Sequence, residues 1–135
     1  MRELPLTCVI GAGSSGIAAA KALHERGIPF DCYEKSDQVG GNWVFGNRNG
    51  MSSAYRSLHI NTSRERMEYS DFPMPKSYPD FPHHTHIAQY FNDYVDLIVG
   101  PVFYLDSKLQ PGGAAHLWTT QIDVDIPLGK APKKP

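Results

Sequence analysis

A glycine-rich segment near the N-terminus limits the folds open to this chain more than any other feature. Residues 7–16 read Thr-Cys-Val-Ile-Gly-Ala-Gly-Ser-Ser-Gly, a short apolar strand followed by the pattern Gly-x-Gly-x-x-Gly. A helix-like stretch, residues 17–26, comes next, and a second apolar run, residues 28–33, ends at the acidic residue Glu34. This order of strand, turn, helix, strand and acid is typical of a dinucleotide-binding β-α-β unit, whereas an ordinary glycine-rich turn lacks it.

Each glycine of the pattern has a separate physical role. Gly11 allows a tight turn out of the strand, Gly13 lets the backbone approach a pyrophosphate, and Gly16 lets the helix pack closely against the strand. The start of the helix then directs free N–H groups and the positive end of its dipole at the phosphates. These three glycines, with Ser14 and Ser15 between them, are therefore candidate phosphate-binding residues.

Glu34 limits the choice of dinucleotide. Its carboxylate can accept hydrogen bonds from the ribose hydroxyls, and its charge repels a 2′-phosphate, so the site suits FAD or NAD better than NADP. Lys35, the next residue, could soften that repulsion and is also a candidate cofactor-binding residue. A solvated lysine at a strand end is the simpler interpretation of it.

The composition excludes several other classes of function. A chain of 135 residues provides one ordinary domain, and its formal net charge of −1, without a basic stripe, gives no indication of nucleic-acid binding. No apolar run approaches the roughly 20 residues of a membrane span, and no signal peptide precedes the first strand, so a cytoplasmic location is expected. Cys8 and Cys32, one in each predicted strand, are then expected to be free, buried thiols.

The rest of the chain is less regular. Residues 40–43, Gly-Gly-Asn-Trp, form a loop whose two glycines permit positive φ and close backbone approach. Residues 44–82 are rich in Gly, Ser, Asn and Pro and predict a long irregular connection, which is more often functional than idle. A helix is expected over residues 86–96 with Thr85 as its N-cap, and its apolar face comprises Ile87, Phe91, Tyr94, Val95 and Ile98.

Two further features bear on the chemistry. His83, His84 and His86 could supply metal ligands, but no acid or cysteine stands at ligand spacing, so they are interpreted as loop and cap residues and no metal is predicted. No cysteine follows Cys32, which excludes the dithiol chemistry of a flavin disulfide reductase. Five aromatic residues are interpreted as core packing: Tyr55, Tyr69, Phe72, Phe81 and Phe91.

Taken together, these motifs resemble the N-terminal part of the flavin-containing monooxygenases, the class B flavoprotein monooxygenases. The resemblance covers roughly residues 6–96 and rests on the GAGSSG turn, the acid at Glu34 and the GGNW loop. It continues through Tyr55-x-x-Leu58-x-x-Asn61-Thr62-Ser63-Arg64-Glu65, Tyr69-x-Asp71-Phe72-Pro73-x-Pro75, Phe81-Pro82-His83-His84, and Gln89-Tyr90-Phe91 with Tyr94.

The resemblance implies FAD as the cofactor and NADPH as a co-substrate. Members of this family reduce FAD with NADPH, let the reduced flavin react with oxygen, and transfer an oxygen atom to a soft nucleophile such as an amine or a sulfide. The cofactor carries this chemistry, while the protein positions it and excludes water. The partner it implies is therefore a small-molecule nucleophile.

The resemblance also implies roles for particular residues. It assigns the FAD pyrophosphate to Gly11, Gly13 and Gly16, and the adenosine ribose to Glu34. It places the loop over residues 40–43, with Gly41, Asn42 and Trp43 as binding candidates, against the cofactor and Leu58 and Asn61 near the flavin. Thr62 is a further candidate cofactor-binding residue. Asn61 is the catalytic candidate, because a neutral amide can donate a hydrogen bond to the flavin or the nicotinamide without titrating. An asparagine that only forms a turn is the alternative for Asn61.

Parts of the family pattern are not found in the sequence. It contains no second Gly-x-Gly-x-x-Gly and no Phe-x-Gly-x-x-x-His-x-x-x-Tyr-like segment, and the resemblance stops after residue 96. We therefore expect an incomplete, truncated α/β domain, with residues 1–96 as a Rossmann-like FAD-binding β-α-β portion. Residues 97–135 are expected to be a divergent, poorly ordered tail, from which residues 102–105 could supply a third strand.

Three functions stay open at this point. The first is the FAD-binding portion of an NADPH-dependent monooxygenase, and the second is a catalytically inert fragment that binds an adenine dinucleotide. The third is an FAD-linked amine oxidase or dehydrogenase, against which the segments Asn61-Thr62-Ser63 and Asp71-Phe72-Pro73 argue. The substrate and the oligomeric state are not readable from these residues.

Overall fold

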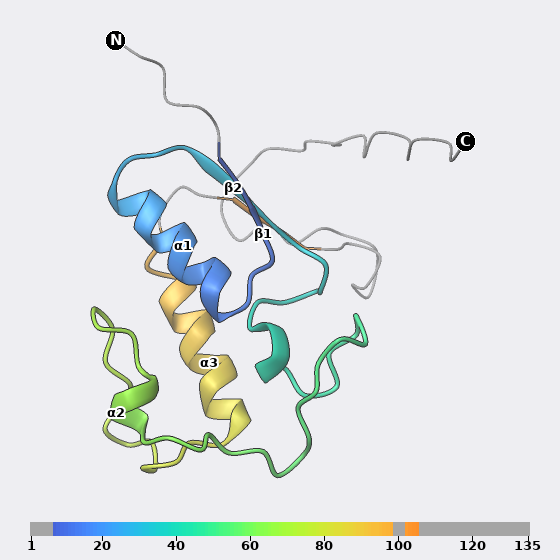
Figure 1. Ribbon diagram of the computed structural model, residues 1–135, viewed down its shortest axis with the longest axis vertical. Coiled ribbons are helices and arrows are strands. Elements are labelled where there is room, and N and C mark those ends of the chain that lie inside the picture. The colour runs from blue at the N-terminus through green and yellow to red at the C-terminus, as the bar shows by residue number, and fades with distance from the viewer. Residues whose placement is uncertain (1–6, 99–101, 106–135) are drawn as a thin grey trace.

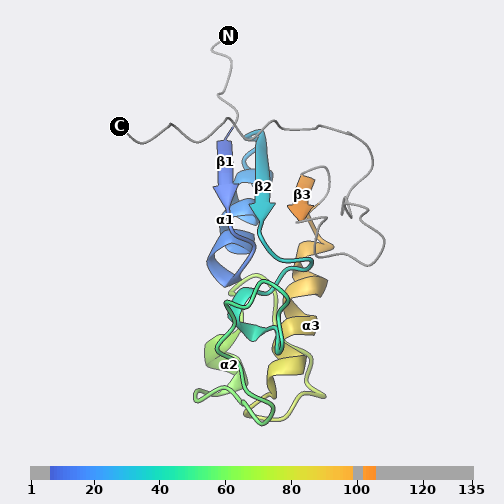
Figure 2. The same cartoon turned by 90° about the vertical axis from the view of Figure 1, so that its right-hand side faces the viewer.

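The computed structural model describes residues 7–98 and the backbone of residues 102–105. Along the chain its elements are β1 (Thr7–Ile10), α1 (Ser14–Glu25), β2 (Phe30–Glu34), the 3-10 turn η1 (Gly41–Trp43), α2 (Arg64–Met67), α3 (His84–Val95) and β3 (Val102–Leu105). The three strands lie side by side in the order β1-β2-β3, and both pairings are parallel (Figure 2). The predicted α/β class and its β-α-β unit are confirmed.

The third strand comes from the segment after residue 96. Residues 102–105 pair in register with β2, Asp31 opposite Val102 and Glu34 opposite Leu105. β2 is therefore paired on both sides, which stabilises a parallel sheet that two strands alone would leave marginal. The suggestion of a strand at residues 102–105 is confirmed, whereas the expectation of a poorly ordered tail falls, over residues 106–135, outside the described residues.

Helix α1 begins earlier than the hydrophobic pattern predicts. It runs from Ser14 rather than from residue 17, because Gly13 adopts extended backbone and acts as the N-cap. At its other end Gly27 has φ of 62°, and its N–H donates to the carbonyl of His24 at 3.0 Å. The N–H of Ile28 donates to the carbonyl of Leu23, which completes a Schellman motif. Gly27 therefore terminates α1 in the left-handed conformation that favours glycine.

The N-terminus of α3 differs from the prediction. The helix starts at His84, and its N-cap is His83 rather than Thr85. The His83 side chain accepts a hydrogen bond from the Thr85 backbone N–H at 3.3 Å. An imidazole nitrogen thus caps the helix, a role for which sequence rules favour Ser, Thr, Asp or Asn.

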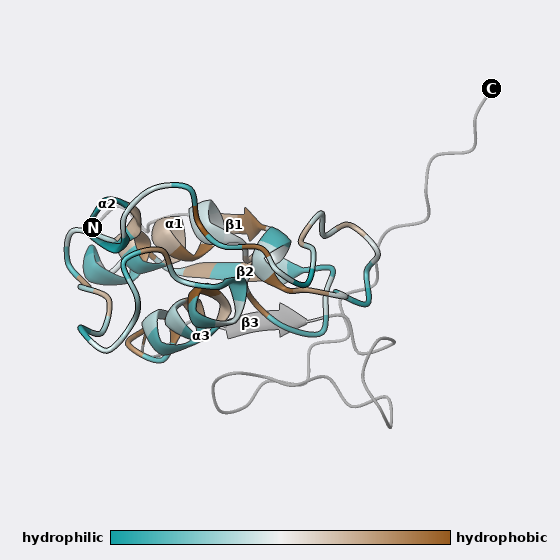
Figure 3. Ribbon diagram, turned by 90° about the horizontal axis from the view of Figure 1, so that it is seen from below, coloured by the Kyte–Doolittle hydropathy of each residue, from teal (hydrophilic) through white to brown (hydrophobic). Residues whose placement is uncertain are grey.

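Among the described residues, helices cover one face of the sheet and none covers the other. Helix α1 packs against β1 and β2 and also contacts α3, which runs beside it (Figure 1). On β1, however, Cys8 is exposed and Ile10 is 87% exposed. This strand is nevertheless hydrophobic, as its brown colour in Figure 3 shows. The expectation that Cys8 is buried was wrong, because no described element covers this face of β1. Cys32 on β2 is buried, and both thiols are free, as expected.

The core between the helices is rich in aromatic rings. The predicted apolar face of α3 is buried as expected, and Tyr90, which the prediction omitted, is fully buried. The Tyr90 hydroxyl donates to the Phe72 carbonyl at 2.5 Å and accepts from the Tyr69 N–H at 2.7 Å. Tyr69, Phe72, Tyr90, Phe91 and Tyr94, hereafter the aromatic cluster, have ring centroids as close as 4.4 Å.

Two of the aromatic residues expected in the core are on the surface instead. Tyr55 is 58% exposed and Phe81 is 54% exposed. Both belong to the irregular connection over residues 44–82, where side-chain burial follows no period that a sequence pattern could show. Among the described residues no helix is long and apolar enough to cross a membrane.

Candidate functional site

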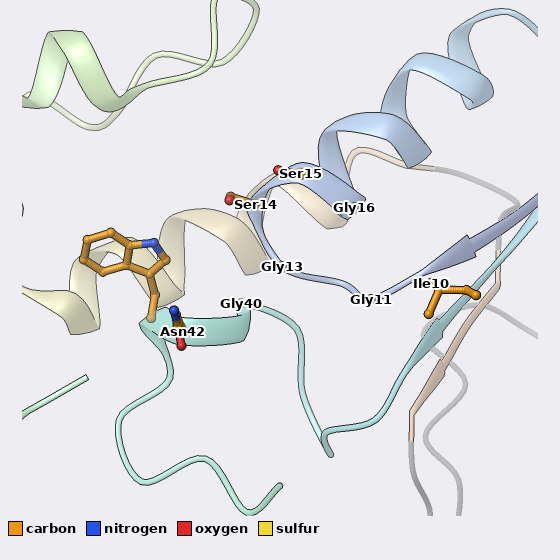
Figure 4. A pocket seen from close by; sticks show the side chains of 9 residues that line it. Ile10, Gly11, Gly13, Ser14, Ser15, Gly16, Gly40 and Asn42 are labelled. Atoms are coloured by element: carbon orange, nitrogen blue, oxygen red, sulfur yellow. The ribbon is translucent and has the colours of Figure 1, made fainter. Parts of the chain in front are cut away.

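A pocket of about 410 Å³ lies at the carboxyl end of β1. Its first wall is the turn from β1 into α1, with Gly11, Gly13, Ser14, Ser15 and Gly16, and its second wall is the segment with Gly40, Asn42 and Trp43. Figure 4 shows the start of α1 and the segment with Gly40 and Asn42 facing each other across this space. The carboxyl end of a parallel sheet is where ligands bind in open α/β folds.

Two of the three glycines in the first wall are required by the conformation and packing of the chain itself. Gly11 has φ of 94°, which favours glycine, as the predicted turn out of the strand demands. A Cβ added at Gly16 would lie 1.8 Å from the Gly11 carbonyl oxygen, so only glycine fits where the helix meets the turn. These two predicted roles agree with the geometry.

Gly13 is a glycine that the described chain does not itself need. Its backbone is extended, with φ of −80°, and a Cβ there would meet only the Gly41 Cα at an ordinary 3.8 Å. Gly13 itself lines the pocket. A glycine at this position leaves the backbone accessible to a ligand, as it is where a pyrophosphate approaches the backbone.

The start of α1 offers hydrogen-bond donors to the pocket. The first bond within the helix runs from the Ile17 N–H to the Gly13 carbonyl at 3.0 Å, so the N–H groups of Ser14, Ser15 and Gly16 have no acceptor inside the helix. The first turn contains no acidic side chain that could take them, and Gly13 makes no side-chain cap. Donors of this kind, at the positive end of a helix dipole, favour an anion.

The second wall is built around two left-handed glycines. Gly40 has φ of 119° and Gly41 has φ of 55°, as the double glycine predicts. The Gly40 N–H donates to the Ala12 carbonyl at 2.9 Å, and a Cβ on Gly41 would lie 3.1 Å from the Gly13 Cα. The two walls are therefore in backbone contact, which a side chain at Gly41 would disturb.

Glu34 lies at the end of β2, beside the first wall rather than in the pocket lining. One carboxylate oxygen accepts the Ala12 N–H at 2.6 Å, and the other accepts the Ser36 N–H at 2.7 Å. Each carboxylate oxygen can accept more than one hydrogen bond, so both keep capacity for a ribose hydroxyl. The side chain of Lys35 is exposed and reaches the Met51 sulfur at 3.7 Å, so Lys35 does not contact the pocket lining.

Cys32 contacts the glycine turn through its thiol. Its thiol is 3.8 Å from the Gly11 carbonyl oxygen, to which it is a weak donor. Burial raises the pKa of Cys32 to about 12, and the nearby Glu34 carboxylate acts in the same direction. The thiol therefore stays protonated and serves in packing, which agrees with the expectation of an inert core cysteine.

Leu58, Asn61 and Thr62 lie apart from the pocket lining. Their segment is fastened to the entrance of α3, where the Leu58 carbonyl accepts the His84 N–H at 2.9 Å. Asn61 and Thr62 are exposed, and Leu58 is partly buried. The arrangement does not bring them to the glycine turn, and their roles near a flavin stay predictions.

The histidine group has structural contacts in this fold. Besides capping α3, His83 places Nε2 2.8 Å from the Arg56 carbonyl. His84 is buried with its ring 5.5 Å from that of Phe45, and the His86 ring lies 4.5 Å from Tyr78. Within residues 7–98 and 102–105 no three His, Cys, Asp or Glu side chains are grouped to hold a metal ion.

Sequence reasoning missed three residues at or behind the pocket. Ile10 lines it and adjoins the glycine turn that the prediction had recognised, whereas Gly40, which also lines it, belongs to the predicted loop over residues 40–43. Ser36 and Asn47 stand behind the second wall with their side chains buried. No pattern marks these two, since each stands in a loop where polar residues are ordinary.

A parallel β-α-β unit with a glycine turn and an anion-seeking helix start defines an α/β protein of the dinucleotide-binding type. The sequence profile of the flavin-binding monooxygenase-like family matches residues 6–99. The chain belongs to this family, which confirms the resemblance drawn from the motifs.

Individual relatives agree with that membership. The chain is 43% identical over 88 residues to flavin-containing monooxygenase 5 of Oryctolagus cuniculus, covering 64% of this chain and 16% of the relative. It is 41% identical over 85 residues to dimethylaniline monooxygenase [N-oxide-forming] 2 of Mus musculus, covering 62% and 16%. Among solved structures, S-allyl-L-cysteine S-oxygenase of Allium sativum superposes with a TM-score of 0.61 at 25% identity, covering 73% of this chain and 28% of that one. The chain thus spans 16% of the length of these curated relatives.

Proposed function

We propose that this chain binds FAD and that the pocket between the two walls receives its pyrophosphate. The carrying observation is Gly13, whose missing Cβ leaves space that the protein does not use and that a close-lying phosphate requires. The N–H groups at the start of α1 that lack an acceptor within the helix supply hydrogen-bond donors, and these favour a negatively charged ligand. Membership in a flavin-binding family supports FAD over NAD.

Within this proposal the residues divide by cofactor part. The N–H groups of Ser14, Ser15 and Gly16 would hold the pyrophosphate, and Glu34 would accept the ribose hydroxyls while keeping its bonds to the backbone. Asn42 and Trp43 line the second wall, where they would contact the cofactor. Lys35, Leu58, Asn61 and Thr62 keep their proposed contacts with the cofactor, and Asn61 keeps its proposed catalytic role.

We further propose that this FAD-binding portion serves NADPH-dependent oxygenation of soft nucleophiles such as amines and sulfides. When bound, the flavin supplies the redox chemistry with NADPH and oxygen, and the protein supplies position and exclusion of water. Two relatives support this substrate class by name, since one is N-oxide-forming and another is an S-oxygenase.

The direct test is equilibrium binding of FAD and of ADP to the purified chain and to Gly13→Ala. We expect Gly13→Ala to weaken both by at least about tenfold, or 1.4 kcal/mol, because its methyl group occupies the phosphate space. Its free energy of unfolding should fall by no more than about 1 kcal/mol, the cost of alanine in place of glycine at an N-cap, since the Cβ contacts only Gly41 at 3.8 Å. Ser70→Thr, which adds a methyl group at an exposed position outside the pocket, should change neither property.

Two results would refute the assignment. Failure of the parent chain to bind either ligand would refute cofactor binding by these residues. Equal affinity of Gly13→Ala and the parent would place the pyrophosphate elsewhere.

A second measurement concerns turnover. We expect FAD bound to this chain alone to be reduced slowly by NADPH in anaerobic stopped-flow experiments. Hydride transfer needs the nicotinamide held against the flavin, a contribution of about 7–11 kcal/mol to lowering the barrier, and the sequence contains a single Gly-x-Gly-x-x-Gly turn. Rapid reduction with stoichiometric oxygenation of a tertiary amine would contradict this expectation.

A further inference from the structure

A closed ring of hydrogen bonds joins the two walls of the pocket from behind. Starting at the first wall, Ala12 donates its N–H to Glu34, and Glu34 accepts the Ser36 N–H with its other oxygen. The Ser36 hydroxyl donates to the Asn47 side-chain oxygen at 2.6 Å, and the Asn47 amide donates to the Gly41 carbonyl at 3.4 Å. The ring closes where the Gly40 N–H donates to the Ala12 carbonyl at 2.9 Å.

Ser36 and Asn47 are the members of this ring that no known role explains. Ser36 is fully buried and Asn47 is 7% exposed, and neither lines the pocket. Buried polar side chains are costly unless hydrogen-bonded, and the Asn47 oxygen at 2.6 Å is a closer acceptor for the Ser36 hydroxyl than the Asp37 carboxylate at 3.4 Å. The Asn47 oxygen also accepts the Asn49 N–H at 3.2 Å, which fixes the amide orientation.

We propose that Ser36 and Asn47 are positioning residues of the dinucleotide site and set the separation of its two walls. The second wall needs such support because Gly40 and Gly41, which approach the first wall, have no side chains to pack. The ring ties that wall to Glu34, so the segment facing the pyrophosphate and the carboxylate facing the ribose move as one unit. This inference rests on the proposed function for its ligand, while the ring itself is a property of the free chain.

The experiment compares Ser36→Ala and Asn47→Asp with the parent 135-residue chain. Ser36→Ala removes the central donor, and Asn47→Asp keeps the acceptor for Ser36 but replaces the donor to Gly41 with a carboxylate. Matched controls are Ser70→Ala, at an exposed position, and Asn92→Asp, which removes a similar amide donor to the Ala88 carbonyl within α3. Each protein is measured by amide hydrogen exchange without ligand and by equilibrium binding of FAD.

We expect exchange of the Gly40 and Ala12 amides to quicken by about tenfold in Ser36→Ala and Asn47→Asp, with the Phe91 amide in α3 unchanged. Where the parent binds FAD, both variants should bind it about tenfold more weakly, and the controls should match the parent. Asn47→Asp should have the larger effect on exchange, since it places a buried carboxylate against the Gly41 carbonyl oxygen, whereas Ser36→Ala removes one neutral hydrogen bond.

The possible results separate this inference from the proposed function. Unchanged protection at Gly40 overturns the inference, as does parallel quickening at Gly40 and Phe91, which would mean global destabilisation. Local quickening with unchanged FAD affinity also overturns it, because the walls would then move without consequence for the ligand. A parent that binds no FAD refutes the proposed function alone, and the exchange data then decide whether the ring holds the walls.

Discussion

The pocket and the aromatic cluster are built in opposite ways within one small fold. The two pocket walls meet through glycines and backbone groups, and their geometry depends on side chains that are missing, as at Gly16 and Gly41. The aromatic cluster depends on large side chains that fill space, with Tyr90 and Phe91 almost completely buried. The pocket should therefore be sensitive to added atoms, and the cluster to removed ones.

The two regions are nevertheless connected. The Tyr69 hydroxyl donates to the Ser14 carbonyl at 2.6 Å, from the cluster to the first turn of α1. Desolvation raises the pKa of Tyr69, and the neighbouring Tyr90 adds to this shift, so the hydroxyl stays a donor. Packing in the cluster thus supports the helix end whose N–H groups face the pocket.

The largest expected effect comes from adding a methyl group at the pocket. Gly16→Ala would place a Cβ 1.8 Å from the Gly11 carbonyl oxygen, so the helix and the turn must separate. We expect a loss of stability of about 4 kcal/mol or more, measured by chemical denaturation followed by circular dichroism. Ser15→Ala, one residue earlier and exposed, should stay within about 0.5 kcal/mol of the parent. Unfolding of Gly16→Ala at the parent midpoint would show that the close contact is easily relieved.

An intermediate effect is expected from removing one oxygen atom in the aromatic cluster. Tyr90→Phe keeps the ring but leaves the Tyr69 N–H and the Phe72 carbonyl without the hydroxyl that joins them. We expect a loss of about 1–3 kcal/mol in the free energy of unfolding. Tyr55→Phe, at a residue that is 58% exposed, is the matched control and should change little. Equal stability of the two variants would mean that ring packing alone holds the cluster.

The smallest expected effect is a pH dependence at the first turn of α3, next to the second wall. Burial lowers the pKa of His84 below its usual value of 6.5, and the nearby His83 and His59 rings lower it further. Below pH 6.5 the unfolded chain therefore binds a proton that the folded chain does not, so stability falls as the pH falls toward the lowered pKa of folded His84.

Denaturation midpoints between pH 8 and pH 5 test this expectation. His84→Gln should have a shallower dependence on pH than the parent, since its side chain does not titrate. His24→Gln in α1 is the matched control for the loss of an imidazole. Identical pH profiles for the parent and His84→Gln would exclude His84 as a source of the effect.

The sequence predicted those parts of the molecule that local rules govern. The β-α-β order, the positive φ of Gly11 and Gly40, and the buried face of α3 follow from residue spacing and from the conformations open to glycine. The family could also be recognised, because its motifs combine such local requirements in a fixed order. The N-cap of α3 was missed, because a histidine acts as a cap only where another carbonyl, here that of Arg56, fixes its ring.

The tertiary structure alone decided which strand residues are buried and which distant polar groups pair. Cys8 and Cys32 have similar strand contexts in the sequence, yet one is exposed and the other buried. The difference depends on which face α1 covers, and hydrophobic pattern does not specify that in a parallel strand. The Ser36–Asn47 bond likewise joins residues 11 positions apart that no short-range rule relates. Spacing along the chain therefore determined the conformation of each wall, whereas packing between elements determined how the walls are held together.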